Sequence, residues 1–168
     1  MRLPFFGRRR LRPTSSLVQH IGAAGAVTTP PPQPRELIDV VGVGLTETVG
    51  GVALTLLSVE RYREAHVALF RLFRARGRFE WEFPSPHLDL AVTPEGEAPY
   101  RYWMMSGSGG GGMRELEFRQ SYAIAPAPPS EATETVIEVR KISWERYAAG
   151  TYKVVAVDTG PWRFSLKR

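Results

Sequence analysis

Cysteine is absent from this 168-residue chain, and histidine occurs only as His20, His66 and His87. Without cysteine the chain can form neither a disulfide framework nor a thiolate metal site. The three histidines are not spaced i, i+4 from one another, and a zinc site needs three or four converging ligands. We therefore predict no metal site and no cofactor. The lack of disulfides is natural for a cytosolic protein, so a cytoplasmic location is the first expectation.

Long apolar runs and catalytic signatures are also missing. No run of about 18 apolar residues is present, so we predict no transmembrane helix. The glycines of residues 107–112 match a dinucleotide fingerprint, but a strand-like run follows them where that fingerprint requires a helix. The spacing of Gly107-Ser108-Gly109 does not match a nucleophile elbow. Glu80 and Glu82 are neighbours on one strand face, whereas paired glycosidase carboxylates come from separate elements. No catalytic residue can be nominated, and we predict that the protein is not an enzyme.

Acidic residues are lacking from the first 35 positions, which carry six arginines. The remaining 133 residues carry sixteen basic and seventeen acidic side chains, a net charge of −1. The overall charge of +5 therefore belongs to the N-terminal segment rather than to the folded body. Any contact with nucleic acid or anionic lipid is expected only from its arginine cluster, which consists of Arg8, Arg9, Arg10 and Arg12.

Three interpretations of residues 1–35 remain open. Their composition favours a disordered basic extension, and the prolines between Pro30 and Pro34 favour an extended linker that cannot join a sheet. Alternatively, the paired arginines and the weakly apolar stretch 17–26 indicate a twin-arginine-like export signal cleaved near Ala26. The third alternative is an arm that binds phosphates or anionic lipids. We divide the chain into this extension (1–35) and one folded domain (36–168).

Short alternating runs dominate the folded domain. Val52, Leu54 and Leu56 share one face of a run, as do Leu116 and Phe118, and a period of two is typical of strands. Eight or nine such runs, punctuated by glycine and proline, predict an all-β sandwich or barrel. The segment 60–76 is ambiguous, because its local periodicity favours a helix although the surrounding runs favour a strand.

A glycine-rich tract, Ser106–Gly112, separates two of these runs and is expected to be a flexible hairpin loop. In the run before it, Tyr100 and Tyr102 share one face. Alternating aromatic residues in a sandwich usually belong to the core, but one exposed face could stack on sugars or bases. Core positions are the expectation for another group of aromatic residues, namely Phe79, Trp81, Phe83, Trp162 and Phe164.

Several stretches together resemble a group of uncharacterised bacterial immunoglobulin-like β-sandwich proteins. They are Leu88–Gly96, Tyr100–Tyr102, the glycine tract, Phe118–Pro129 with Ala132, Val136–Ile142 with Trp144, and Gly160–Phe164. The resemblance covers roughly Glu36 to Leu166. It implies a single immunoglobulin-like antiparallel β-sandwich in which Ala65–Arg74 is a strand, and it carries no catalytic or binding residues.

These observations predict a non-enzymatic module that binds another protein through an exposed sheet edge or loops. The candidate interaction residues are Gly107, Gly109, Gly110, Tyr100 and Tyr102, with the turn at 94–98 as a second region. One alternative is a sandwich that binds a carbohydrate or small ligand on its tyrosine face. The other is binding of nucleic acid or anionic membrane through the N-terminal arginines.

Overall fold

The computed structural model describes residues 33–75, 84–93, 100–112, 114–129 and 132–167. Eight strands and no helix lie in these ranges, which confirms the all-β prediction. The strands are β1 (Leu37–Val49), β2 (Val52–Tyr62), β3 (His66–Ala75), β4 (Ser85–Thr93), β5 (Arg101–Gly111), β6 (Glu115–Ala125), β7 (Glu134–Ala148) and β8 (Thr151–Lys167). Other predictions fall outside the described residues. These concern the arginine cluster, the cleavage position near Ala26, the run Phe79–Phe83 and the turn at 94–98.

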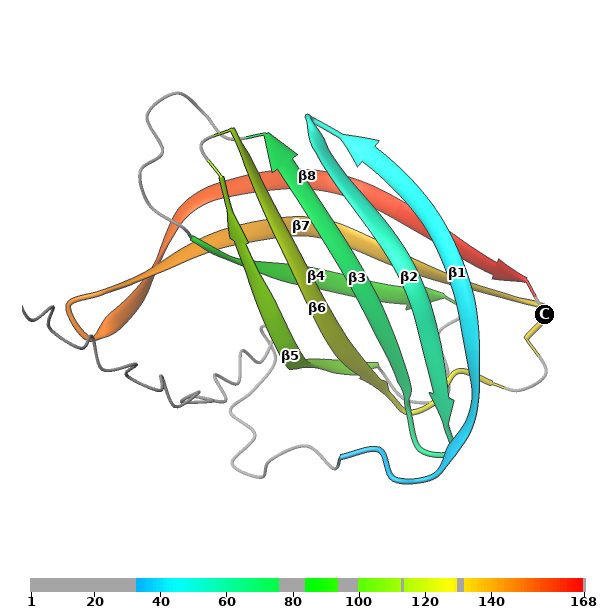
Figure 1. Cartoon of the computed structure of the whole chain (residues 1–168). Coiled ribbons are helices and arrows are strands. Elements are labelled where there is room, and N and C mark those ends of the chain that lie inside the picture. Colours follow the sequence, from blue (N-terminus) through cyan, green and yellow to red (C-terminus); the bar gives the residue numbers. More distant parts are fainter. Residues whose placement is uncertain (1–32, 76–83, 94–99, 113, 130–131, 168) are drawn as a thin grey trace, which may run out of the picture.

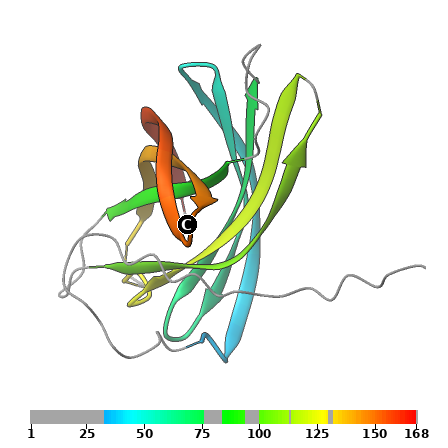
Figure 2. The same cartoon turned by 90° about the vertical axis from the view of Figure 1, so that its left-hand side faces the viewer.

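Two antiparallel sheets form a sandwich. One sheet has five strands in the order β1-β2-β3-β6-β5, and the other has three in the order β4-β7-β8. Figure 1 looks onto the outer face of the five-stranded sheet, and Figure 2 shows the two layers from the side. The predicted sandwich of antiparallel strands is therefore confirmed. The finer immunoglobulin-like grouping remains a prediction.

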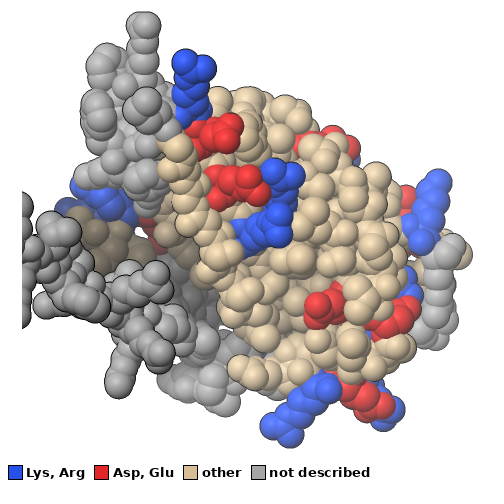
Figure 3. Space-filling model, viewed as in Figure 1, with Lys and Arg blue, Asp and Glu red and all other residues tan. Residues whose placement is uncertain are grey.

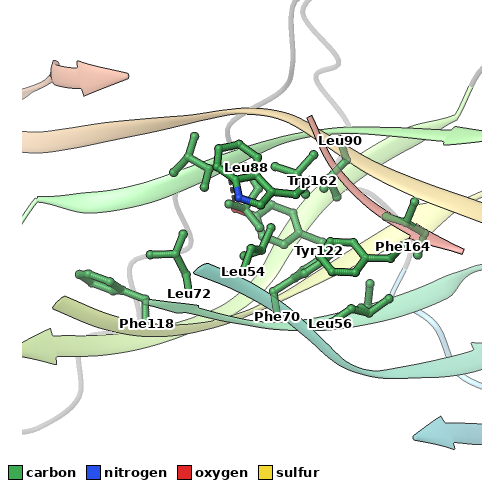
Figure 4. Packing of buried hydrophobic residues seen from close by; sticks show 14 of the residues in the cluster. Leu54, Leu56, Phe70, Leu72, Leu88, Leu90, Phe118, Tyr122, Trp162 and Phe164 are labelled. Atoms are coloured by element: carbon green, nitrogen blue, oxygen red, sulfur yellow. Dashed lines mark hydrogen bonds between the residues drawn. The ribbon is translucent and has the colours of Figure 1, made fainter. Parts of the chain in front are cut away.

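The core lies between the sheets and follows the alternation seen in the sequence. Val52, Leu54 and Leu56 are fully buried on the inner face of β2, and Leu116 and Phe118 are buried on β6. The aromatic rings of the core come from both sheets, as Figure 4 shows for Phe70, Tyr122, Trp162 and Phe164. Each such ring removes about 150–250 Å² from water, so these rings contribute much of the burial that stabilises the sandwich.

The ambiguous segment 60–76 is a strand pair rather than a helix. β2 ends at Tyr62 and β3 begins at His66, so the strand expected at Ala65–Arg74 is confirmed. β3 lies between β2 and β6 and buries residues on both faces, including Val67 and Phe70. A strand that carries apolar residues on both faces shows little alternation, which is why its sequence resembled a helical stripe.

Two of the edge strands are long. β1 continues to Val49, and only Gly50 and Gly51 turn, with φ of 58° and 81°. Residues 153–157 and 162–166 belong to one strand, β8. Its two halves differ. Trp162 is fully buried and donates from Nε1 to the carbonyl oxygen of Val52 at 3.1 Å, whereas residues 151–155 are all exposed.

Candidate interaction surface

The glycine tract is part of a strand, so the prediction of a flexible loop at Ser106–Gly112 is wrong. β5 runs on to Gly111 and pairs with β6, placing Gly107 opposite Gln120 and Gly109 opposite Phe118. The chain changes direction only between Gly111 and Glu115.

The reason is that side chains of β6 lie across β5. A Cβ atom at Gly109 would meet the Phe118 ring and would lie 2.6 Å from the Glu117 carbonyl oxygen. Gly110 faces the opposite side, where no atom lies within 4 Å of such a Cβ. Glycine thus lets a large side chain of the neighbouring strand cover the edge strand. A shallow depression of ≈ 290 Å³ at this edge includes Gly109, Gly110 and Phe118 in its lining.

Tyr100 and Tyr102 pack against the core. The Tyr102 ring centroid lies 6.5 Å from that of Tyr122, and its hydroxyl donates to Asp89 Oδ1 at 2.7 Å. Burial, with a further contribution from the Asp89 hydrogen bond, raises the pKa of Tyr102 to about 12. The structure therefore places these two tyrosines between the sheets, while Trp103 lies on the outer face of β5 and donates from Nε1 to the Met105 sulfur at 3.0 Å.

Four strands lie at the sheet edges, and β4 is closed by side chains of β6. Gln120 donates from Nε2 to the Pro86 carbonyl oxygen at 2.6 Å, and the Leu88 amide donates to the Tyr122 hydroxyl at 3.0 Å. Tyr122 in turn donates to Gln120 Oε1 at 3.2 Å. These bonds occupy two backbone groups that an incoming strand would need, so β4 is a poor edge for strand addition.

The β1 edge is irregular. Its register with β2 shifts between Leu37 and Asp39 and again between Gly42 and Leu45, and Gly44 has a φ of 68°. Bulges of this kind bend an edge strand and hinder regular pairing with another chain. β1 still exposes several apolar residues, with relative exposures of 45–66% (Leu37, Ile38, Val40 and Leu45).

The first half of β8 differs from these three edges. Among the described strands, β8 has β7 on one side and no further strand in its sheet on the other. Val154, Val155 and Val157 are 57%, 49% and 52% exposed. The cross-strand partners Tyr147 and Tyr152 pack with their ring centroids 5.0 Å apart and their planes tilted by 57°, and they are 63% and 37% exposed. Figure 1 shows this β7–β8 hairpin, in orange, extending past the five-stranded sheet.

We call residues 147–157 the β7–β8 arm. Val154 lies two residues after Tyr152 on the same face, and Val155 is the extra residue where the register with β7 shifts. Two-stranded hairpins are at best marginally stable without a covering layer, and exposed apolar clusters commonly mark protein contacts. The sequence did contain a signal, because valines at 154, 155 and 157 cannot all lie on one buried face of a regular strand.

Groups that could carry chemistry do not converge in the part of the chain that the structure describes. No three His, Asp or Glu side chains there are placed to hold a metal ion. His87 lies in β4, with its Nε2 3.4 Å from Glu145 Oε2. The described residues also contain no helix long and apolar enough to cross a membrane.

Comparison with known proteins informs the fold alone. No protein family and no curated protein sequence matches the chain. Its structure is similar to one described as the crystal structure of the conserved domain protein from Bacillus anthracis, with a TM-score of 0.56 and 14% identity. The match covers 77% of this chain and 48% of the Bacillus chain, so the chain spans about half the length of that relative. A likeness at this identity supports a shared fold and carries no function.

Proposed function

We propose that this sandwich is a non-enzymatic module that binds another protein through the β7–β8 arm, with β8 as the pairing edge. One observation supports this most strongly: the first half of β8 is a sheet edge whose valines are about half exposed. An added strand would use the outward backbone groups of β8 for affinity and the Tyr152–Val154 face for side-chain contacts.

The other three sheet edges are less suited to strand addition than β8. Side chains of β6 occupy backbone groups of β4, and two register shifts interrupt β1. In β5, residues 107 and 109–111 are glycines, so an incoming strand would find no side chains there to contact. The candidate interaction residues Gly107, Gly109 and Gly110 therefore mark a weaker edge than β8.

Site-specific photo-crosslinking tests the proposal. A photoreactive phenylalanine replaces Tyr152 in one sample and Leu45, which is also exposed but lies on β1, in another. We expect a discrete crosslinked protein at position 152 and none at position 45. Adding Val154→Lys should lower the yield at position 152 by about tenfold, because a charged edge residue opposes strand addition.

Matched variants distinguish a local effect from misfolding. Leu45→Lys introduces the same charge at an exposed apolar position and should leave the yield at position 152 unchanged. Equal capture at both positions, or capture that survives Val154→Lys, would rule out the arm as the binding surface.

A further inference from the structure

In both sheets, charged side chains form pairs of opposite sign. On the five-stranded sheet, Arg71 Nε lies 2.9 Å from Glu117 Oε1, and Figure 3 shows basic and acidic side chains adjoining one another on this face. Acidic residues of the three-stranded sheet are paired in the same way, so their charge is already matched by a basic group. These pairs are Asp89 with Lys141, Glu138 with Arg140 and Arg163, and Asp158 with Arg74.

Lys153 of the β7–β8 arm lies in a different environment. It is exposed, and its cross-strand partner on β7 is Arg146, which carries the same charge. The next pair on the same face, Ala148 and Thr151, is uncharged. This face of β7 therefore supplies no counter-charge for Lys153, and like charges in directly opposite positions of a strand pair are destabilising.

The other side of Lys153 is the edge of the sheet, where none of the described strands lies next to β8. A strand added to this edge would place one residue directly beside Lys153, in the row that also contains Arg146. An acidic residue at that position would lie beside Lys153 and close to Arg146. A basic residue would be the third cation of the row. Charge complementarity therefore favours an acidic residue at this position of the added strand.

The opposite face of the arm favours another kind of side chain. Tyr147 and Tyr152 form the neighbouring row on that face, and Val154 follows Tyr152 there. The pairing of β7 with β8 is regular from Thr151 to Val154, so these rows are well defined. Because side chains alternate along a strand, the two residues that flank the acidic position would lie beside Tyr152 and Val154. Apolar side chains fit both positions, since they bury surface that is now exposed.

We infer that the β7–β8 arm binds an extended protein segment in which an acidic residue, flanked by two apolar residues, pairs with Lys153. The inference rests on the proposed function, because it assumes that β8 accepts a strand, and it adds the chemistry of that strand. A second copy of the arm is a poor match, since residues 151–157 contain a lysine and no acidic residue. Nucleic acids and lipids lack the peptide groups with which the β8 edge would pair.

Three synthetic peptides that differ only in charge test the inference on the full-length protein. Each alternates valine with glutamate, glutamine or lysine, and fluorescence anisotropy at low ionic strength measures its binding. We expect the glutamate peptide to bind about fivefold more tightly than the lysine peptide, with the glutamine peptide between them. Lys153→Glu should abolish the advantage of the glutamate peptide. Lys167→Glu makes the same change at the opposite end of β8 and should preserve that advantage.

A fourth peptide separates strand addition from simple charge attraction. Methylation of alternate amide nitrogens in the glutamate peptide keeps its charge but removes backbone donors, and it should weaken binding about tenfold. Undiminished binding of the methylated peptide would overturn the inference, as would equal loss of the glutamate advantage in the two lysine variants.

The affinities also distinguish failure of the inference from failure of the proposed function. Equal binding of the three unmethylated peptides that Val154→Lys abolishes would overturn the inference and leave β8 as the pairing edge. Equal binding that survives Val154→Lys, or no binding of any peptide, would contradict the proposed function as well.

Discussion

At the scale of single residues, Gly109 and Gly110 show how neighbours in one strand meet different surroundings. The inner face at Gly109 is covered by the Phe118 ring, whereas Gly110 has open space at the same distance. The need for glycine at position 109 therefore comes from packing across the strand pair, because its backbone φ lies outside the left-handed region.

We predict that Gly109→Ala destabilises the protein by about 2 kcal/mol, since the new methyl group forces the Phe118 ring or the β6 backbone to move. Gly110→Ala should change the free energy of unfolding by less than about 0.5 kcal/mol. Urea unfolding of the two variants measures the difference directly. Similar stabilities of the two variants would show that the ring does not rest on the glycine.

His66 makes the free energy of unfolding depend on pH. Burial lowers its pKa to about 4, and nearby Arg61 acts in the same direction, while Asp39 opposes the shift. Between pH 6.5 and 4 the unfolded chain therefore binds more protons than the folded chain, and stability falls as the pH falls through this range.

We expect the titration of His66 to lower the free energy of unfolding by roughly 2 kcal/mol when the pH falls from 7 to 4. This figure is reduced from the full effect of the pKa shift because solvent screens a half-buried site. The measurement is urea unfolding at both pH values for the native chain and for His66→Gln. The variant should lose this part of the pH dependence. An identical pH profile for the two proteins would assign the effect to the carboxylates instead.

At the scale of secondary-structure elements, the closure of β4 depends on Gln120 and Tyr122. Burial raises the pKa of Tyr122, so its hydroxyl stays protonated and can donate to Gln120 while it accepts from the Leu88 amide. This arrangement joins an edge of the three-stranded sheet to the inner face of the other sheet.

We predict that Tyr122→Phe costs about 1–2 kcal/mol, because it leaves the buried Leu88 amide without its acceptor. Amide hydrogen exchange at Leu88 should become faster in this variant. Tyr102→Phe removes a hydroxyl of the same kind that binds Asp89, and it should leave the exchange at Leu88 unchanged. Unchanged exchange in Tyr122→Phe would exclude the hydroxyl as the group that closes this edge.

Strands with one buried face and one solvent-exposed face were predictable from the sequence. Strands that lack this alternation were harder to predict. β2 and β6 were evident because polar residues alternate with buried ones. β3 was ambiguous because it carries apolar residues on both faces, including Val67 and Phe70. The extent of β5 could not be foreseen, because glycine normally indicates a loop, and its strand conformation depends on the Phe118 side chain of another strand.

At the scale of the whole molecule, two sheets enclose one core and differ in how their edges are closed. Cross-layer contacts hold them together, including Arg74, which lies 3.4 Å from Asp158 and over the Trp144 ring at 4.8 Å. Trp144 also donates from Nε1 to Asp158 at 2.6 Å. These contacts lie next to the point where β8 leaves the core and the β7–β8 arm begins.

The sandwich was predictable because composition and periodicity dictate burial. The candidate surface was only partly predictable, since an exposed edge was expected but its identity was not. Whether a strand edge stays open depends on side chains that reach it from other elements, as those of β6 reach β4. No local sequence pattern reports such contacts, and the valines at 154, 155 and 157 indicate only that not all of them can face the core.

The most direct test of the binding surface is amide hydrogen exchange of the protein with and without the partner captured at Tyr152. Strand addition predicts slower exchange at alternate amides between Thr151 and Val157 in the complex, with no change in β5 between Ser106 and Gly111. Slower exchange in β5, together with unchanged exchange in β8, would show that the partner pairs with β5 and not with β8.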